Sequence, residues 1–353
     1  MFYEATPLSE KKTLKPSAKK HRYSALTVKD ASKLIESLNA HKVTAESSHT
    51  SHLTERVSES SEEKKEEFRI LLSGFAVAES VNKPGLRRSK KSVAIGRLKR
   101  AYEMEDVHFC EFPWNSNDSF GLFCVFDGHS GKECALAARR LIPEYLSRHL
   151  EGVNLNVGDD GQVGSAHSLK EVFEAVFLEV DQELCDYEYE GTTCTVVFLW
   201  RNSEGRRFVQ AANVGDSTAL LIRNEVAIPL TEKHHLNVDS EFNRVRMSGV
   251  NIHQGQTRLN GLAVSRALGD HFPKSVQCGI IALPSVSPVF ELSDVDSFLI
   301  LATDGLWDVI CHQRSYEIIK NETSPKEMSE LLLVTALNSV DCTDNVTTVV
   351  VKL

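Results

Sequence analysis

Hydrophobic residues from about residue 120 onward fall into short apolar runs and longer amphipathic stretches. Short runs bounded by turn residues predict strands, and apolar positions that recur every three or four residues predict helices. The predicted strands are Leu122–Phe126, Thr193–Trp200, Arg207–Val214, Ser217–Arg223, Val286–Glu291, Phe298–Ala302 and Val346–Val351. The predicted helices are Lys132–Leu150, Ser168–Cys185, Arg314–Lys320 and Lys326–Leu337.

The spacing of these segments indicates how the strands pair. Short connections join the three predicted strands between Thr193 and Arg223. They predict antiparallel hairpins, because a parallel crossover needs about a dozen residues or more. Since the predicted helices stand in separate blocks, we expect an α+β fold with a sheet core covered by helices.

Residues 1–82 have a different character, and we interpret them as an N-terminal extension of a domain at 83–353. The Lys- and Ser-rich start predicts disorder. Thr27–Asn39 has a capping pattern and an apolar stripe, which predict a helix that docks on the body or binds a partner. Ser92–Gly96 predicts a strand that enters the body. Arg87–Lys91 is a candidate nuclear-import or anion-binding patch.

The charge is distributed unevenly along the chain. The whole sequence has 40 Lys and Arg against 49 Asp and Glu, a formal net charge of −9. Residues 1–100 hold 21 basic and 12 acidic residues, whereas residues 101–353 hold 19 and 37. The strongly acidic body argues against nucleic acid as a partner, because phosphate backbones are bound through Lys and Arg. An acidic body is compatible with bound cations.

Further features bear on the cellular location. The N-terminus lacks the apolar stretch of a signal peptide, and no apolar run approaches the ~20 residues that a membrane helix needs. The eight Cys all lie at or after Cys110, without a zinc-like spacing, which is typical of reduced thiols. We therefore expect a cytoplasmic or nuclear protein that does not engage a membrane.

Acidic residues stand repeatedly at the ends of predicted strands. The strand-end acids are Glu105, Asp106, Asp127, Asp216, Asp304 and Asp344. A single Asp-Gly pair is typical of a turn, but several carboxylates gathered at one edge would repel one another unless a cation offset their charge. Oxygen ligands without Cys or clustered His favour Mg²⁺ or Mn²⁺, and two such ions can support displacement at phosphorus. His129, directly after Asp127-Gly128, is either a proton donor or a turn histidine bonded to backbone.

Several of these segments together resemble an ordered signature. The set resembles the metal-dependent PP2C (PPM) family of serine/threonine phosphatases over roughly residues 92–353. The matching segments are Tyr102–Asp106, Val125–His129, Gly191–Cys194, Val214–Ser217, Leu262–Asp270, Ala302–Asp308 and Asp344–Thr347.

The resemblance implies a four-layer α/β/β/α sandwich with two central antiparallel sheets and metals at one end. It implies two Mg²⁺ or Mn²⁺ ions, with a weaker third, and hydrolysis of phosphoserine or phosphothreonine on proteins by a metal-bound hydroxide. His129 would be the general acid, and the region from about His234 to Gly261 a mobile flap near the substrate. The implied metal ligands are Asp127 as the bridge, the Gly128 carbonyl, Asp304 with Asp344, Glu105 or Asp106, and Asp216 with Asp308 at the third ion.

Two departures from the family pattern leave an alternative open. The family has a phosphate-gripping Arg where this chain has Ala101, so we expect neighbouring Arg100 to take that role if a bulge re-aims it. One residue is also missing between Gly261 and Leu262, at the end of the flap. The main hypothesis is therefore an active, monomeric phosphatase, and the alternative is a pseudophosphatase or regulatory binding module. A nuclease or cyclase has little support, because no cluster of aromatic residues suits base stacking.

Overall fold

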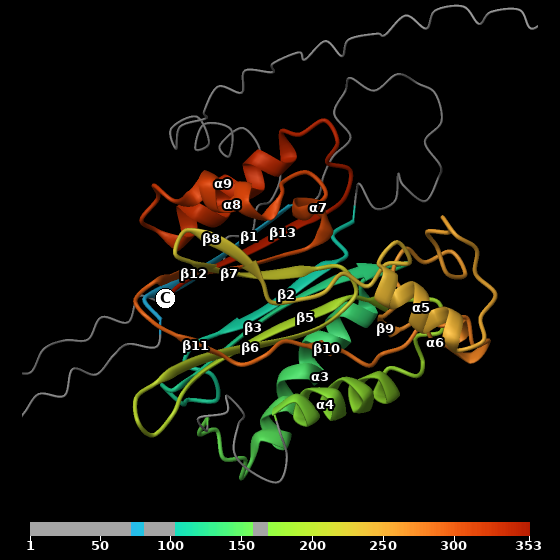
Figure 1. Ribbon diagram of the computed structural model, residues 1–353, viewed down its shortest axis with the longest axis horizontal. Coiled ribbons are helices and arrows are strands. Elements are labelled where there is room, and N and C mark those ends of the chain that lie inside the picture. Colours follow the sequence, from blue (N-terminus) through green and yellow to red (C-terminus); the bar gives the residue numbers. More distant parts are fainter. Residues whose placement is uncertain (1–71, 81–102, 158–168) are drawn as a thin grey trace, which may run out of the picture.

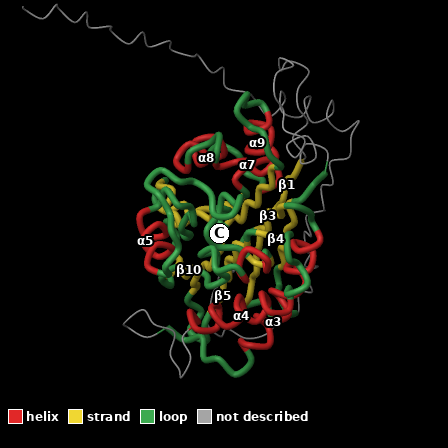
Figure 2. Tube along the Cα trace, turned by 90° about the vertical axis from the view of Figure 1, so that its right-hand side faces the viewer, coloured by secondary structure: helices red, strands yellow, loops and turns green. Residues whose placement is uncertain are grey.

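Two antiparallel sheets pack face to face, and each carries helices on its outer face (Figure 1). The structure is a computed structural model that describes residues 72–80, 103–157 and 169–353. In Figure 2, which is turned by 90°, the strands lie between two groups of helices. Helices α7, α8 and α9 lie on one side, and α3 and α4 lie on the other. The expected α+β fold with four α/β/β/α layers is confirmed.

The first sheet has five strands among the described residues. Their order is β1 (Gly74–Ser80), β13 (Val346–Lys352), β12 (Asp296–Ala302), β7 (Thr218–Arg223) and β8 (Val226–Pro229). Its outer face packs against α7 (Asp304–Trp307), α8 (His312–Ile319) and α9 (Pro325–Leu337).

The second sheet has eight strands within the same described ranges. Its main path is β10 (Ser285–Val286), β6 (Arg207–Val214), β5 (Cys194–Arg201), β3 (Phe120–His129), β4 (Gly191–Thr192) and β9 (Leu268–Gly269). Two more strands flank it, β2 (Asp106–Glu111) beside β3 and β11 (Phe290–Leu292) beside β6. Helices α3 (Glu133–Leu150) and α4 (Leu169–Glu183) cover its outer face.

Central strands are buried on both faces, which explains their continuous apolar runs. On β3, Phe123 and Val125 join the core between the sheets, whereas Leu122, Cys124 and Phe126 face α3 and α4. Strands β5, β7, β12 and β13 divide their side chains in the same way between the inner core and an outer one. Three apolar layers therefore hold the four layers of secondary structure together.

The prediction that β6 and β7 form an antiparallel hairpin is wrong. Strands β5 and β6 form the expected antiparallel pair, but β7 belongs to the other sheet. The chain crosses between the sheets at Gly215, which has a φ of 95° and lies against Thr193, where a Cβ would overlap the threonine side chain. A short connection limits distance but does not determine which sheet the next strand joins, so connection length alone could not reveal this crossing.

The first sheet also begins earlier than the expected domain boundary after residue 82. Gly74–Ser80 forms the edge strand β1, which pairs with β13 over its full length. Phe75 and Val77 pack on the core between the sheets, and Ala78 faces the outer core. The expected Thr27–Asn39 helix, the Ser92–Gly96 strand, the Arg87–Lys91 patch and Arg100 all lie outside the described residues.

The predicted strand Val286–Glu291 is divided in two. Strands β10 and β11 both pair with β6, but Pro288 lies between them and cannot donate a backbone hydrogen bond. Two short helices, α5 (Asp239–Met247) and α6 (His271–Ser275), were not predicted. No helix in the described ranges is long and apolar enough to cross a membrane.

A test of the fold concerns Gly305, where α7 meets the start of β13. A Cβ at this position would overlap the carbonyl oxygen of Asn345, which is backbone and cannot rotate away. We expect Gly305→Ala to lower the free energy of unfolding by about 2 kcal/mol or more, because overpacking forces backbone shifts. Urea unfolding measures the change. Ser203→Thr, which adds a methyl group in an exposed turn, is the control, and equal stability of the two variants would contradict the packing described here.

Candidate active site

Carboxylates from both sheets meet at one end of the sandwich. Asp106 on β2 lies directly opposite Asp127 on β3, so both side chains point to the same face of that sheet. Asp304 follows β12 of the first sheet, Asp344 precedes β13, and Asp216 lies in the crossing between the sheets. The packing of the two sheets therefore brings together acids that are far apart in the sequence.

Three of these acids form a close cluster. Asp127, Asp216 and Asp304 each present a carboxylate oxygen, and these oxygens lie within 4.8 Å of one another. The Oδ1 atom of Asp304 is buried and has no hydrogen-bond partner among the described residues. A donor set made of carboxylate oxygens, with one buried oxygen left without a hydrogen bond, fits Mg²⁺ or Mn²⁺.

The electrostatics of the cluster explain why it would attract a cation. Burial, followed by the charges of neighbouring carboxylates, raises the pKa of Asp127 and of Asp304 well above the usual range. Burial also acts to raise the pKa of Asp216, but the hydrogen bond from His235 and the nearby positive charges of His235 and Lys233 outweigh it, and the net change is a lowered pKa. A bound divalent ion would offset the repulsion between the first two acids.

Asp106 is held by both sheets. Its Oδ2 accepts hydrogen bonds from the hydroxyls of Thr303 (2.8 Å) and Thr347 (2.9 Å), on segments that continue from β12 and begin β13. Burial is the largest influence on its pKa and raises it to about 7, although the two hydroxyls act in the opposite direction. Asp106 thus links the two sheets directly behind the cluster.

Glu105 and Gly128 are packed against one another. The Glu105 backbone N–H donates to Asn345 Oδ1 at 2.8 Å, and its carbonyl accepts from the Gly128 N–H at 3.2 Å. A Cβ at Gly128 would come too close to that same carbonyl, so glycine is required for the approach. The Glu105 side chain is 6% exposed.

The remaining candidate ligands lie around the cluster. Asp344 is partly buried, and its charge contributes to the raised pKa of Asp106, Asp127 and Asp304. Asp308 lies one turn after Asp304 and is exposed. The family resemblance implied that Asp216 and Asp308 hold a weaker third ion, which stays a prediction; the carboxylate of Asp216 lies close to those of Asp127 and Asp304. Arg100 lies outside the described residues.

His129 pairs with a residue to which the sequence analysis gave no role. Its Nε2 atom lies 2.7 Å from Oδ2 of Asp270, which is 1% exposed. Because a carboxylate can only accept a hydrogen bond, Nε2 carries the proton. Of the two interpretations left open, a backbone-bonded turn histidine does not describe this contact. Gly191 lies opposite His129, and a Cβ there would overlap both side chains of the pair.

Two histidines tie the beginning of the expected flap to the cluster. His235 Nε2 lies 2.6 Å from Asp216 Oδ2. His234 accepts from the Gly215 N–H at Nδ1 and contacts Ser285 Oγ at Nε2. Burial lowers the pKa of His234 to about 3, so this ring is neutral near pH 7.

Comparison with known proteins identifies the family. The family profile described as Protein phosphatase 2C matches residues 94–346. The chain belongs to the protein phosphatase 2C family, as the residues quoted in the sequence analysis predicted.

Individual relatives agree with this assignment. A probable protein phosphatase of Dictyostelium discoideum is 41% identical over 286 residues, covering 80% of this chain and 27% of its own length. Protein phosphatase 2C homolog 1 of Saccharomyces cerevisiae is 34% identical over 265 residues, covering 71% of this chain and 88% of its own. The chain spans 27%, 30% and 39% of the length of three relatives, two from Dictyostelium and one from Arabidopsis thaliana.

Solved structures support the fold. The crystal structure of a serine-threonine phosphatase 2C from Toxoplasma gondii has a TM-score of 0.61 and 19% sequence identity, and covers 79% of this chain and 94% of its own. The structure of a Caenorhabditis elegans sex determining protein has a TM-score of 0.58 and 21% identity, with 72% and 62% covered.

The raised pKa of Asp304 allows the repulsion in the cluster to be tested by measuring stability instead of enzymatic activity. Folding raises the pKa of Asp304 above its ordinary value of 3.8. The free energy of unfolding of the protein therefore falls as the pH rises above 3.8, because the folded state disfavours the ionised carboxylate. In EDTA at pH 8, Asp304→Asn should therefore unfold at a higher urea concentration than the wild type, by on the order of 0.5 M. Added Mn²⁺ should stabilise the wild type more than the variant, because an ion that binds the folded cluster would lose one carboxylate ligand in the variant.

Asp341→Asn provides the control for this comparison, because Asp341 is an exposed acid in the loop before β13. It should leave both the unfolding midpoint in EDTA and the gain with Mn²⁺ as in the wild type. An Asp304→Asn variant that is no more stable than the wild type in EDTA would contradict the repulsion described here.

Proposed function

We propose that this protein hydrolyses phosphoserine and phosphothreonine on other proteins and requires Mg²⁺ or Mn²⁺. The observation that carries the proposal is the convergence of Asp127, Asp216 and Asp304 within 4.8 Å, in a chain of the protein phosphatase 2C family. The alternative, a pseudophosphatase or regulatory binding module that retains the fold and the metals, is not favoured, since the relatives reported above are named as protein phosphatases.

We assign two roles to the residues of the site, metal binding and proton transfer. Asp127, Asp216 and Asp304 would hold the ions, with Glu105, Asp344, Asp308 and the Gly128 carbonyl as further ligands. Bound ions would supply an activated water and offset the charge of the phosphate. Asp106, held by the hydroxyls of Thr303 and Thr347, keeps its carboxylate oriented toward the same end of the sheets.

His129 is the proposed proton donor to the leaving serine or threonine oxygen. Asp270 accepts from Nε2–H and fixes the orientation of the ring, so His129 would act as the doubly protonated imidazolium and donate its second proton from Nδ1. Gly191 leaves room for both side chains of the pair, because a Cβ at this position would overlap them. Arg100 remains our predicted contact for the substrate phosphate.

Hydrolysis of a phosphothreonine peptide by the purified protein tests the proposal. Phosphate release should require Mn²⁺ or Mg²⁺, should stop with EDTA, and should fall at least about a hundredfold in Asp127→Asn, because that variant keeps the shape of the side chain but removes the charge. Turnover that persists in EDTA would contradict the proposed chemistry. Mn²⁺ binding without any turnover would instead favour the binding module.

The His129–Asp270 pair gives a second test. His129→Asn should lower kcat about a hundredfold or more, because the general acid is lost. Asp270→Asn should lower kcat by a smaller factor, since the ring loses its orienting carboxylate but remains present. His149→Asn is the matched control, because His149 also pairs with a carboxylate, that of Glu179 at 3.0 Å, on the helical layer. Equal kcat in wild type and His129→Asn would rule out this role.

A further inference from the structure

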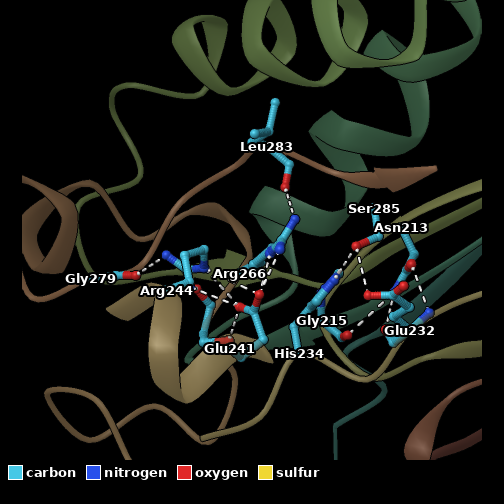
Figure 3. A network of polar contacts seen from close by, with 11 residues as sticks. Asn213, Gly215, Glu232, His234, Glu241, Arg244, Arg266, Gly279, Leu283 and Ser285 are labelled. Atoms are coloured by element: carbon cyan, nitrogen blue, oxygen red, sulfur yellow. Dashed lines mark hydrogen bonds and ion pairs between the residues drawn. The ribbon is translucent and has the colours of Figure 1, made fainter. Parts of the chain in front are cut away.

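A buried ionic network lies between α5 and the segment that leads to Asp270 (Figure 3). The Glu241 carboxylate, on α5, is 2% exposed and is surrounded by donors. Arg266 Nη2 lies 2.6 Å from its Oε1, and Arg244 Nη2 and Ser265 Oγ lie 2.8 Å and 2.6 Å from its Oε2. Burial alone would raise the pKa of Glu241, but these hydrogen bonds outweigh it and lower the pKa to about 2.

The two arginines extend the network to three stretches of backbone. Arg244 donates to the carbonyls of Ser265 and Gly279, both at 2.9 Å. Arg266 donates to the carbonyl of Leu283 at 2.9 Å. Figure 3 shows both guanidinium groups converging on the one carboxylate while other nitrogens reach the carbonyls of Gly279 and Leu283. Glu241 therefore anchors α5 to segments that precede and follow β9 and α6.

The part of the chain that α5 belongs to has a small core of its own. Leu236, Val245, Leu259 and Ile280 form a buried cluster that is separate from the three cores of the sandwich. The apolar contacts within this cluster hold the segments around α5 together apart from the cores of the sandwich. We call residues 236–262, which contribute Leu236, Val245 and Leu259 to this cluster, the α5 module; Ile280 joins the cluster from the segment after α6.

The α5 module is connected to the candidate site at both ends. Just before it, His235 contacts Asp216 of the acidic cluster. Just after it, Ser265 and Arg266 lead through β9 to Asp270, the partner of His129. Figure 1 shows α5, α6 and β9 together at the same end of the molecule. The module is thus joined at both ends to residues on which the proposed reaction depends.

We propose that Glu241 is a positioning residue that fixes the α5 module beside the active site and so sets how tightly a phosphoprotein substrate is held. This inference rests on the proposed phosphatase function. Glu241 touches no reacting group, because its carboxylate is enclosed by Arg244, Arg266 and Ser265. Its loss should therefore weaken the binding of a substrate that is large enough to reach the module, without changing the chemical step.

The test compares Glu241→Gln with the wild type on two substrates in Mn²⁺. For a phosphothreonine peptide we expect KM to rise about tenfold with kcat retained, because the neutral amide cannot accept from two guanidinium groups and a hydroxyl. For p-nitrophenyl phosphate, which is too small to reach the module, both constants should stay within about twofold. Equal losses on the two substrates, or no change on either, would overturn the proposal.

Hydrogen exchange makes the test independent of activity. In Glu241→Gln, the backbone amides of the α5 module, including those of α5 itself, should exchange faster than in the wild type. The amides of β3 and α3 should keep the wild-type rates. Unchanged exchange in α5 would overturn the anchoring role even if KM changed. A wild type that hydrolyses neither substrate would refute the proposed function, whereas the exchange result would still decide the role of Glu241.

Two further variants keep the test decisive. Ser265→Ala removes a single donor to Glu241 and should shift KM and exchange in the same direction by a smaller amount, so it replaces Glu241→Gln if that variant does not fold. Glu317→Gln is the matched control, because Glu317 forms an exposed i,i+3 pair with Arg314 on α8 at 2.8 Å. An effect of Glu317→Gln as large as that of Glu241→Gln would overturn the proposal.

Discussion

The packing of the inner faces of the two sheets is the interaction on which the rest of the structure depends. Phe123 and Val125 of the second sheet belong to one apolar layer with Leu299, Leu301, Val349 and Val351 of the first. Because this layer fixes where the strands of both sheets end, it also fixes where the acids after those strands meet. A site built in this way needs no long loop to assemble it.

The carboxylates at this end are costly to bring together, and the surrounding polar groups reduce that cost. Two hydroxyls hold Asp106, and His235 pairs with Asp216. Asp304 retains a buried oxygen without a hydrogen bond from any described residue. Asp106 and Asp216 thus have hydrogen-bond partners, whereas Oδ1 of Asp304 has none among the described residues. This arrangement is expected where an ion completes the coordination.

The sequence predicted the central strands β3, β5, β6, β7, β12 and β13 and the acids beside them, because both leave local signals. Central strands buried on both faces appear as continuous apolar runs, and Asp127, Asp216 and Asp304 each follow such a run. The Asp270 partner of His129 could not be predicted in this way, because the two residues are 141 positions apart and meet only through the pairing of β3, β4 and β9. The crossing at Gly215 and the edge strand β1 likewise depend on which sheet a segment joins, a choice that hydrophobic periodicity does not encode.

The crossing between the sheets has a consequence for how the molecule responds to changes far from its acids. Asp127 belongs to one sheet, Asp304 follows the other, and Asp216 lies on the link between them. Any sliding of one sheet over the other, such as a cavity in the inner core would permit, changes the separation of the three oxygens. The affinity of the cluster for a cation would therefore depend on the alignment of the sheets, and a bound ion would in turn link the two sheets.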